Sequence, residues 1–190
     1  MKKLGIVIAF LVLLSMTISA TALMSKSIIR ENGVSAYGWW SETTDNGYKY
    51  TNLAVMENDK GTDVFVSTCN FDNEGNGGCR DGSAFTTDDV FTVDKKLNSA
   101  TLSTVNVDMF DWNTGEMTTV PVQASWTSDG DLIRSNSRSI SKSSDFTLKF
   151  SGKLNYKNAI VTATLDGTDL GTSSYAEIDQ FNNAYMSIEK

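Results

Sequence analysis

The stretch MTTVPVQASWT, residues 117–127, alternates apolar or small side chains with polar ones. Two sets of side chains result: one face carries Val120, Val122, Ala124 and Trp126, and the other carries Thr119, Pro121, Gln123 and Ser125. Successive side chains of a β-strand point to opposite faces of a sheet, so this period of two predicts a strand with one buried face. Residues 100–110 alternate in the same way, and the polar segment 111–116 contains Asn113 and Gly115. We therefore expect a β-hairpin over residues 100–127.

The same alternation recurs along the chain, interrupted by clusters of Gly, Asn and Asp every ten residues or so. No helical periodicity follows the first 22 residues. This pattern predicts an all-β fold, a single antiparallel β-sandwich of about eight to ten strands. Tight turns are expected at Lys157-Asn158 and Asn182-Asn183, and residues 70–80 are expected to form a loop.

The N-terminus has the features of a signal peptide. Lys2 and Lys3 precede the apolar run Leu4–Leu14, and Ala20-Thr21-Ala22 resembles a cleavage site. The apolar run is shorter than the ~20 residues that a membrane span needs. We expect a signal helix over residues 1–22, a β-sandwich domain over 23–190, and a secreted or cell-surface protein with no membrane association after cleavage. An uncleaved anchor stays open as an alternative.

The chain has two cysteines, Cys69 and Cys79, which we expect to form one disulfide in an exported protein. Nine residues separate them, so they do not form a CxxC redox motif. The formal net charge is −7, with 16 basic and 23 acidic residues. Such a charge disfavours nucleic acid as a partner, because the phosphate backbone is also negative.

Histidine is absent from the sequence. Ser-His-Asp hydrolases and imidazole-ligated metal sites are therefore excluded, and oxidised cysteines would provide no thiolate. We expect a protein that is not an enzyme. A less favoured alternative is a glycoside hydrolase that uses two carboxylates, for which the acids of the turns, such as Asp108, Asp111 and Glu116, are candidates.

One acidic segment partly resembles a calcium loop. The oxygen-bearing candidates are Asp72, Glu74, Asn76 and Asp81. An EF-hand needs a bidentate Glu at its twelfth position, which is Ser83 here, so that motif is excluded. A calcium site of irregular geometry, formed by these four residues, stays open, and calcium is then the only cofactor that we expect. The alternative is a solvated turn held by the disulfide.

Aromatic residues indicate a candidate ligand surface. Trp39 and Trp40 are adjacent in a predicted strand, so they point to opposite faces and only one of them can join a given core. Tyr37, Tyr48 and Tyr50 could extend an aromatic platform of the kind that stacks sugar rings, while Trp112 lies in a predicted turn. The alternative is that these rings fill the core.

Residues 135–144 carry serine at almost every second position, together with Arg138 and Lys142. With Arg134 these residues form a basic strip on an acidic molecule, which could bind a ligand or an acidic patch on a second copy. A strand with a serine ladder on one face would have two polar faces and a poorly specified register, so we expect a mobile edge or a loop here.

Two segments carry a family resemblance. They are FTVDKKLNSATL (residues 91–102) and VPVQASWT (residues 120–127), the latter followed by Gly130-Asp131-Leu132 and by Arg134. Together they resemble a family of uncharacterised secreted β-rich proteins over roughly residues 60–140. The resemblance implies secretion and a β-rich fold, and it brings no activity or catalytic residue. Members of that family often carry histidine after the arginine, and this chain has none.

The sequence thus predicts a secreted or cell-surface, non-enzymatic β-sandwich with a binding or structural role. Its expected partners are an extracellular glycan, a surface protein or a second copy of itself. A glycan-binding module that uses exposed Trp and Tyr side chains is the main alternative to a purely structural role.

Overall fold

The computed structural model describes residues 26–142 and 147–189. The expected signal peptide lies outside these residues. The fold is all-β, as the alternation predicts, and the described residues contain no helix long and apolar enough to cross a membrane. The strands are β1 (Lys26–Thr44), β2 (Gly47–Asn58), β3 (Gly61–Asp72), β4 (Gly77–Thr86), β5 (Phe91–Val93), β6 (Ser99–Asp111), β7 (Met117–Ser128), β8 (Ile133–Lys142), β9 (Thr147–Leu165), β10 (Thr168–Asp169) and β11 (Tyr175–Glu189).

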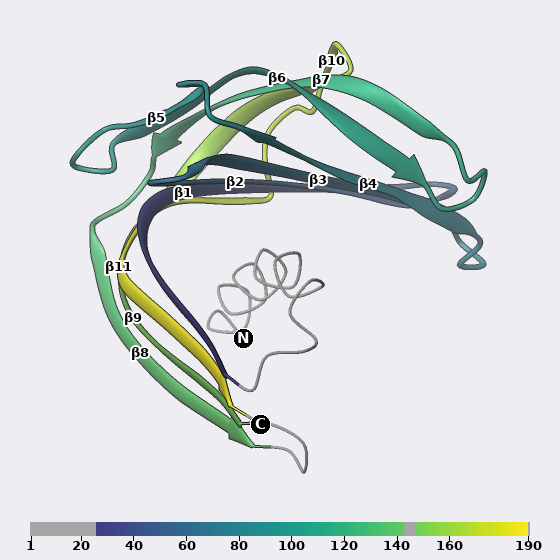
Figure 1. The fold of residues 1–190 in the computed structure, drawn as a ribbon. Coiled ribbons are helices and arrows are strands. Elements are labelled where there is room, and N and C mark those ends of the chain that lie inside the picture. The colour runs from purple at the N-terminus through teal and green to yellow at the C-terminus, as the bar shows by residue number, and fades with distance from the viewer. Residues whose placement is uncertain (1–25, 143–146, 190) are drawn as a thin grey trace. The chain divides into compact units, whose positions relative to one another are not determined.

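The strands pair in the order β10-β9-β11-β1-β2-β3-β4-β6-β5. β7 pairs with both β6 and β9, so the path of paired strands closes on itself, and β8 pairs with β9. The ladders β1–β2, β2–β3, β3–β4, β6–β7 and β7–β9 are all antiparallel. Figure 1 shows β2, β3 and β4 as one layer and β5, β6 and β7 as a second layer facing it.

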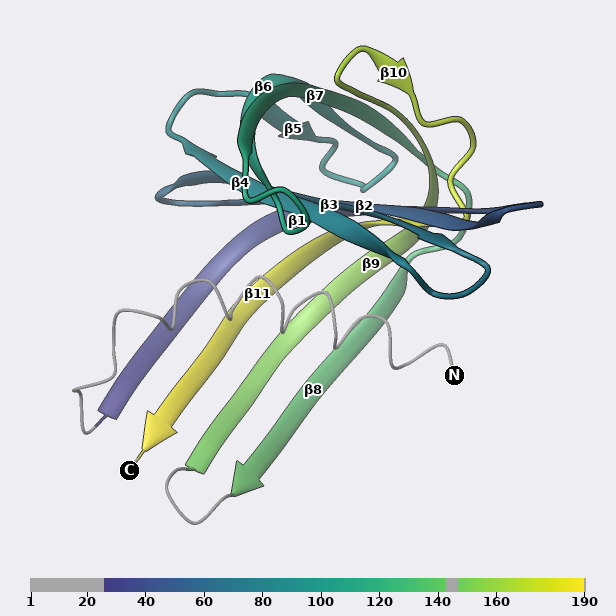
Figure 2. The same cartoon turned by 90° about the vertical axis from the view of Figure 1, so that its right-hand side faces the viewer.

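Contacts divide the chain into two compact units. The larger unit spans Gly33–Ile133 and Asn155–Gln180, and it contains the core described below. The smaller unit consists, within the described residues, of 26–32, 134–142, 147–154 and 181–189. In it, β8, β9, β11 and the start of β1 follow one another in the order of strand pairing (Figure 2).

The core of the larger unit lies between the two layers. All four apolar residues that the sequence assigns to one face of β7 are buried there, which confirms that prediction. The Trp126 ring meets Phe91 edge-on at 6.2 Å, and its indole N–H donates to the Tyr37 carbonyl at 2.9 Å. The other layer contributes alternate residues of its strands: Ala36, Trp40, Leu53, Val55, Val64 and Val66. Burial of each large apolar side chain stabilises the fold by about 1.5–3 kcal/mol.

The disulfide joins Cys69 of β3 to Cys79 of β4, which confirms the predicted pair. The two residues are direct cross-strand partners with a Cα–Cα distance of 4.1 Å. The prediction of a loop over residues 70–80 is wrong, because β3 runs on to Asp72 and β4 begins at Gly77, leaving only a tight turn. The disulfide indicates that the protein folds in an oxidising environment.

Two predicted turns are also wrong. β9 continues through Lys157-Asn158, and β11 continues through Asn182-Asn183. Two-residue hairpin turns need positive φ, which Asn can adopt, but none of these four residues has it. At the first pair, β9 is held by its ladder with β7, where Ala159 faces Ser128, and by a hydrogen bond from the Lys157 ammonium to the Asn98 side chain at 2.7 Å.

Candidate functional site

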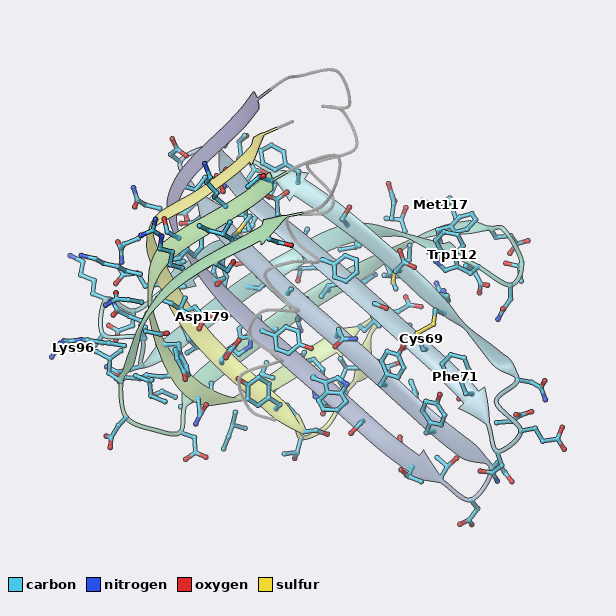
Figure 3. All side chains as sticks on the ribbon, turned by 90° about the horizontal axis from the view of Figure 1, so that it is seen from below. Cys69, Phe71, Lys96, Trp112, Met117 and Asp179 are labelled. Carbon is cyan, nitrogen blue, oxygen red and sulfur yellow. A yellow bond between two sulfur atoms is a disulfide. The ribbon has the colours of Figure 1, made fainter. Side chains whose placement is uncertain are left out.

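The face of β1–β4 that points away from the core carries most of their aromatic residues. Because side chains alternate, the positions between the core residues lie on this outer face. The register places them in rows across the strands. Three rows result: Tyr48 with Phe71; Ser41 with Tyr50, Cys69 and Cys79; and Trp39 with Asn52, Ser67 and Asp81. We call Trp39, Tyr48, Tyr50 and Phe71 the aromatic face. Figure 3 shows Phe71 and Cys69 on this side of the strands.

Three rings of the aromatic face lie nearly parallel. Phe71 stacks on Tyr48 at 5.1 Å with an interplanar angle of 26°, and Tyr50 lies 6.5 Å from Phe71 at 25°. Trp39 is 39% exposed and Tyr48 is 46% exposed. Tyr48, Phe71 and Tyr50 thus form a row of stacked rings on the same face as Trp39, and Tyr50 and Phe71 are half-buried.

Polar groups border the aromatic face. The Tyr37 hydroxyl donates to the Asn52 side chain at 2.6 Å, and Asn52 is the cross-strand partner of Trp39. At the other end of this row the Trp112 indole N–H donates to the Asp81 carboxylate. Trp112 is exposed and meets Phe110 edge-on at 4.9 Å. The row therefore offers amide and carboxylate oxygens between two exposed tryptophans.

The two adjacent tryptophans have opposite environments. Trp40 is 5% exposed, and its indole N–H donates to the Gly171 carbonyl at 3.0 Å. A Cβ at Gly38 would come within 2.7 Å of the Trp40 ring and 2.8 Å of Val161, so glycine at this position leaves room for the ring. Trp40 therefore belongs to the core and has no surface for a ligand, whereas Trp39 and Trp112 do.

Three of the four calcium candidates lie together in the β3–β4 turn, where the Asn76 side-chain amide donates to Glu74 Oε2 at 3.3 Å as well as to Asp72, and only Asp81 lies apart. Asp72 caps the β3–β4 turn: its Oδ1 accepts the amide N–H groups of Glu74 at 2.9 Å and Asn76 at 2.8 Å, and its Oδ2 accepts the Asn76 side-chain amide at 3.1 Å. The Asn76 side chain and backbone hold the pKa of Asp72 below its usual range. Asp81 of β4 is the cross-strand partner of Ser67. Ser67 precedes Asp72 by five residues on β3, so Asp81 lies roughly 16 Å from Asp72 along the strand direction.

An open depression of about 470 Å³ lies at the ends of the same strands. Its lining includes Glu42, Lys49 and Asn70. Strand alternation places these three side chains on the core-facing side, nearer the strand ends than the buried core residues. The aromatic face contributes only Phe71 to this lining. The depression and the exposed rings of Trp39 and Tyr48 are thus separate features.

Sequence reasoning missed two acids on β11. Ala176 and Ile178 point into the core, so Glu177 and Asp179 lie together on the opposite face. Both acids are nevertheless buried, at 3% and 8% exposure. The only sequence signal is the spacing of two acids at i and i+2 in a strand. Figure 3 marks the position of Asp179.

The hydrogen bonds of this acid pair are incomplete. The Tyr175 hydroxyl donates to Glu177 Oε2 at 2.5 Å, and the Ser35 hydroxyl donates to Asp179 Oδ2 at a long 3.4 Å. Asp179 Oδ1 is buried and has no hydrogen-bond partner.

Burial dominates the electrostatics of this region. It raises the pKa of Asp179 well above its usual range, and the nearby Glu177 carboxylate raises the Asp179 pKa further. Burial also raises the pKa of Glu177, which the Tyr175 hydrogen bond opposes. Burial, with a smaller effect from Glu177, raises the pKa of Tyr37 to about 12. Each acid is thus easier to protonate here than in water.

Arg134 and Arg138 lie on β8, where both are exposed. They are four residues apart, so they share one face of that strand. Among the described residues β8 pairs only with β9 and has one free edge. The serine-rich segment is an edge strand up to Lys142 rather than a loop, and residues 143–144 lie outside the described residues.

No family model, no curated protein and no solved structure matches this chain.

Proposed function

We propose that the protein is a secreted or cell-surface binding protein without enzymatic activity, and that its ligand is a glycan held on the aromatic face. The observation that carries this proposal is the set of four aromatic side chains on the outer face of β1–β3, of which Trp39 and Tyr48 are well exposed. Core packing does not account for them, because the core lies on the other side of the same strands.

The chemistry of the face matches a sugar ring. The C–H groups of a pyranose are apolar and stack on an aromatic ring, while its hydroxyls need hydrogen-bond partners. Asn52, Ser67 and Asp81 continue the row that begins at Trp39 and can provide them. Exposed aromatic side chains gathered on one face of a sheet are a feature of binding sites.

Two further features support the proposed location and class. The disulfide fits an extracellular protein, and the N-terminal sequence resembles a signal peptide. The absence of histidine from the sequence removes the commonest acid–base catalyst.

Affinity electrophoresis tests the proposal, using the purified protein in gels that contain β-glucan, xylan, mannan or glycol chitin. We expect at least one polysaccharide to retard the protein. Trp39→Ala and Tyr48→Ala should each weaken that binding about tenfold or more, which is about 1.4 kcal/mol. Ile160→Ala is the matched control, since Ile160 is 49% exposed on β9 and lies outside the aromatic face. Normal mobility in every gel, or unchanged retardation of both aromatic variants, would contradict the proposal.

A second candidate role, self-association, rests on the free edge of β8. Ile133 and Ile140 are 40% and 51% exposed on this strand. An edge strand with exposed backbone groups and exposed isoleucines can pair with the same strand of another copy. Light scattering at micromolar concentration should then show dimers or larger species, which Ile140→Lys would dissociate. A monomer at all concentrations would exclude this role.

A further inference from the structure

The buried acids on β11 need a ligand that the described chain does not provide. Glu177 and Asp179 are successive residues of one strand face, and neither forms an ion pair with a described residue. Asp179 is more than nine-tenths buried, and its Oδ1 has no hydrogen-bond partner. A buried carboxylate oxygen without a partner costs free energy, and a bound cation would offset that cost.

Oxygen-bearing side chains contact the pair or act on it. The Ser35 hydroxyl contacts Asp179, and the Tyr175 hydroxyl contacts Glu177. The Tyr37 and Tyr175 rings lie 6.1 Å apart beside them, and the Glu177 carboxylate acts on the hydroxyls of both. Tyr156 of β9 also acts electrostatically on Tyr175. No described Lys or Arg forms an ion pair with either acid.

Two carboxylates with nearby hydroxyls are hard ligands, which suit Ca²⁺ rather than a softer metal. We propose that Glu177 and Asp179 bind a calcium ion, with the Ser35 hydroxyl as a third oxygen donor and water completing the coordination. The ion would engage Asp179 Oδ1 and offset the repulsion between the two carboxylates.

A proton is the competing occupant. One proton would also reduce the repulsion between Glu177 and Asp179. It would not satisfy Asp179 Oδ1, however, because a hydroxyl at that oxygen has no acceptor within hydrogen-bonding distance, and a proton on Oδ2 leaves Oδ1 as it is. A cation binds that oxygen directly, so the geometry favours the cation.

This site differs from the turn that the sequence indicates. In the turn, both oxygens of Asp72 already accept hydrogen bonds and the side chain is exposed. Asp179 differs in both respects, because its Oδ1 accepts no hydrogen bond and its side chain is buried. The two aspartates therefore form a matched pair for the test. The proposal does not depend on glycan binding, because calcium alone is the probe.

Calorimetric titration of the purified, chelator-treated protein with calcium chloride tests the proposal. We expect one site with a dissociation constant on the order of 10⁻⁴–10⁻³ M, the range of extracellular calcium modules. Asp179→Asn and Glu177→Gln should each raise this constant about tenfold or more, and Asp72→Asn should leave it unchanged. No binding by the unmodified protein, or a loss of binding in Asp72→Asn alone, would overturn the proposal.

Terbium provides a second readout that does not need a variant at either acid. Excitation of tyrosine should sensitise Tb³⁺ luminescence, since Tyr175 contacts Glu177 directly, and added calcium should quench that luminescence by competition. Ser35→Ala leaves both carboxylates in place and should weaken Tb³⁺ binding several-fold in a protein with unchanged circular dichroism. Sensitised luminescence that calcium does not displace would count against the site.

Discussion

The two faces of β1–β3 both carry large apolar side chains, and they have different environments. One face carries Leu53, Val55 and Val64, which the facing layer of strands buries completely. The other carries Trp39, Tyr48 and their neighbours, which no described layer covers. Hydrophobic content alone does not distinguish the two faces. The distinction comes from what lies opposite each of them, so one face stabilises the fold and the other is available to a partner.

Adjacent tryptophans provide the strongest contrast between the faces. Trp40→Ala should lower the free energy of unfolding by about 3–5 kcal/mol, because it opens a cavity in the core and leaves the Gly171 carbonyl without its donor. Trp39→Ala should cost less than about 1 kcal/mol. Urea unfolding of the two variants measures both values. Equal losses would show that the outer face is as important for stability as the core.

The disulfide tests how far the outer face depends on covalent support. Its two cysteines are ten residues apart, so the double variant Cys69→Ser/Cys79→Ser should be less stable by about 2–3 kcal/mol. The loss arises from a more flexible unfolded chain. Polysaccharide binding by the folded fraction should persist, since the β2–β3 ladder holds Tyr48 against Phe71 independently. Loss of binding in a folded double variant would contradict this.

The acid pair predicts a pH dependence in the presence of chelator. The folded protein raises the pKa of Asp179, so the native state binds protons more tightly than the unfolded state. Stability should therefore fall as pH rises above the unfolded value of about 4, and level off once the native group has ionised. The slope is at most about 1.4 kcal/mol per pH unit for one proton. Asp179→Asn should flatten this slope. An unchanged slope would place the titrating group elsewhere.

Asp72 should show the smallest effect. Its hydrogen bonds all lie within an exposed turn. Asp72→Asn keeps an oxygen that can accept both backbone bonds now made to Oδ1 and loses only the Oδ2 acceptor of the Asn76 side-chain amide, so we expect a smaller change in melting temperature than for any variant above. A large loss in differential scanning calorimetry would mean that this turn organises the β3–β4 hairpin.

Local alternation was sufficient to predict part of this molecule. The β6–β7 hairpin, the disulfide and the opposite orientations of Trp39 and Trp40 follow from period two and from cysteine count. β4 was missed because Gly77, Gly78 and Gly82 resemble a loop, although a Cβ at Gly82 would lie 2.0 Å from the Asp108 carbonyl oxygen of β6. Glycine is required there by the close approach of two strands, which depends on tertiary pairing.

The candidate sites were less predictable for the same reason. Alternation indicated that Trp39 and Trp40 separate, but which of them is covered depends on the facing layer. Glu177 and Asp179 occur in a strand pattern in which acids are normally solvated. Their neighbours include Ser35 and Tyr37 of β1, which are more than a hundred positions away in the sequence, so local patterns do not reveal this environment.

Hydroxyl-radical footprinting with and without the polysaccharide that retards the protein tests the role of the outer face most directly. The account predicts that Trp39 and Tyr48 lose most of their oxidation when the polysaccharide is bound. Met117 is 59% exposed at the start of β7, outside the aromatic face, and its oxidation should not change. Full oxidation of Trp39 and Tyr48 in the complex, with protection elsewhere, would contradict the account.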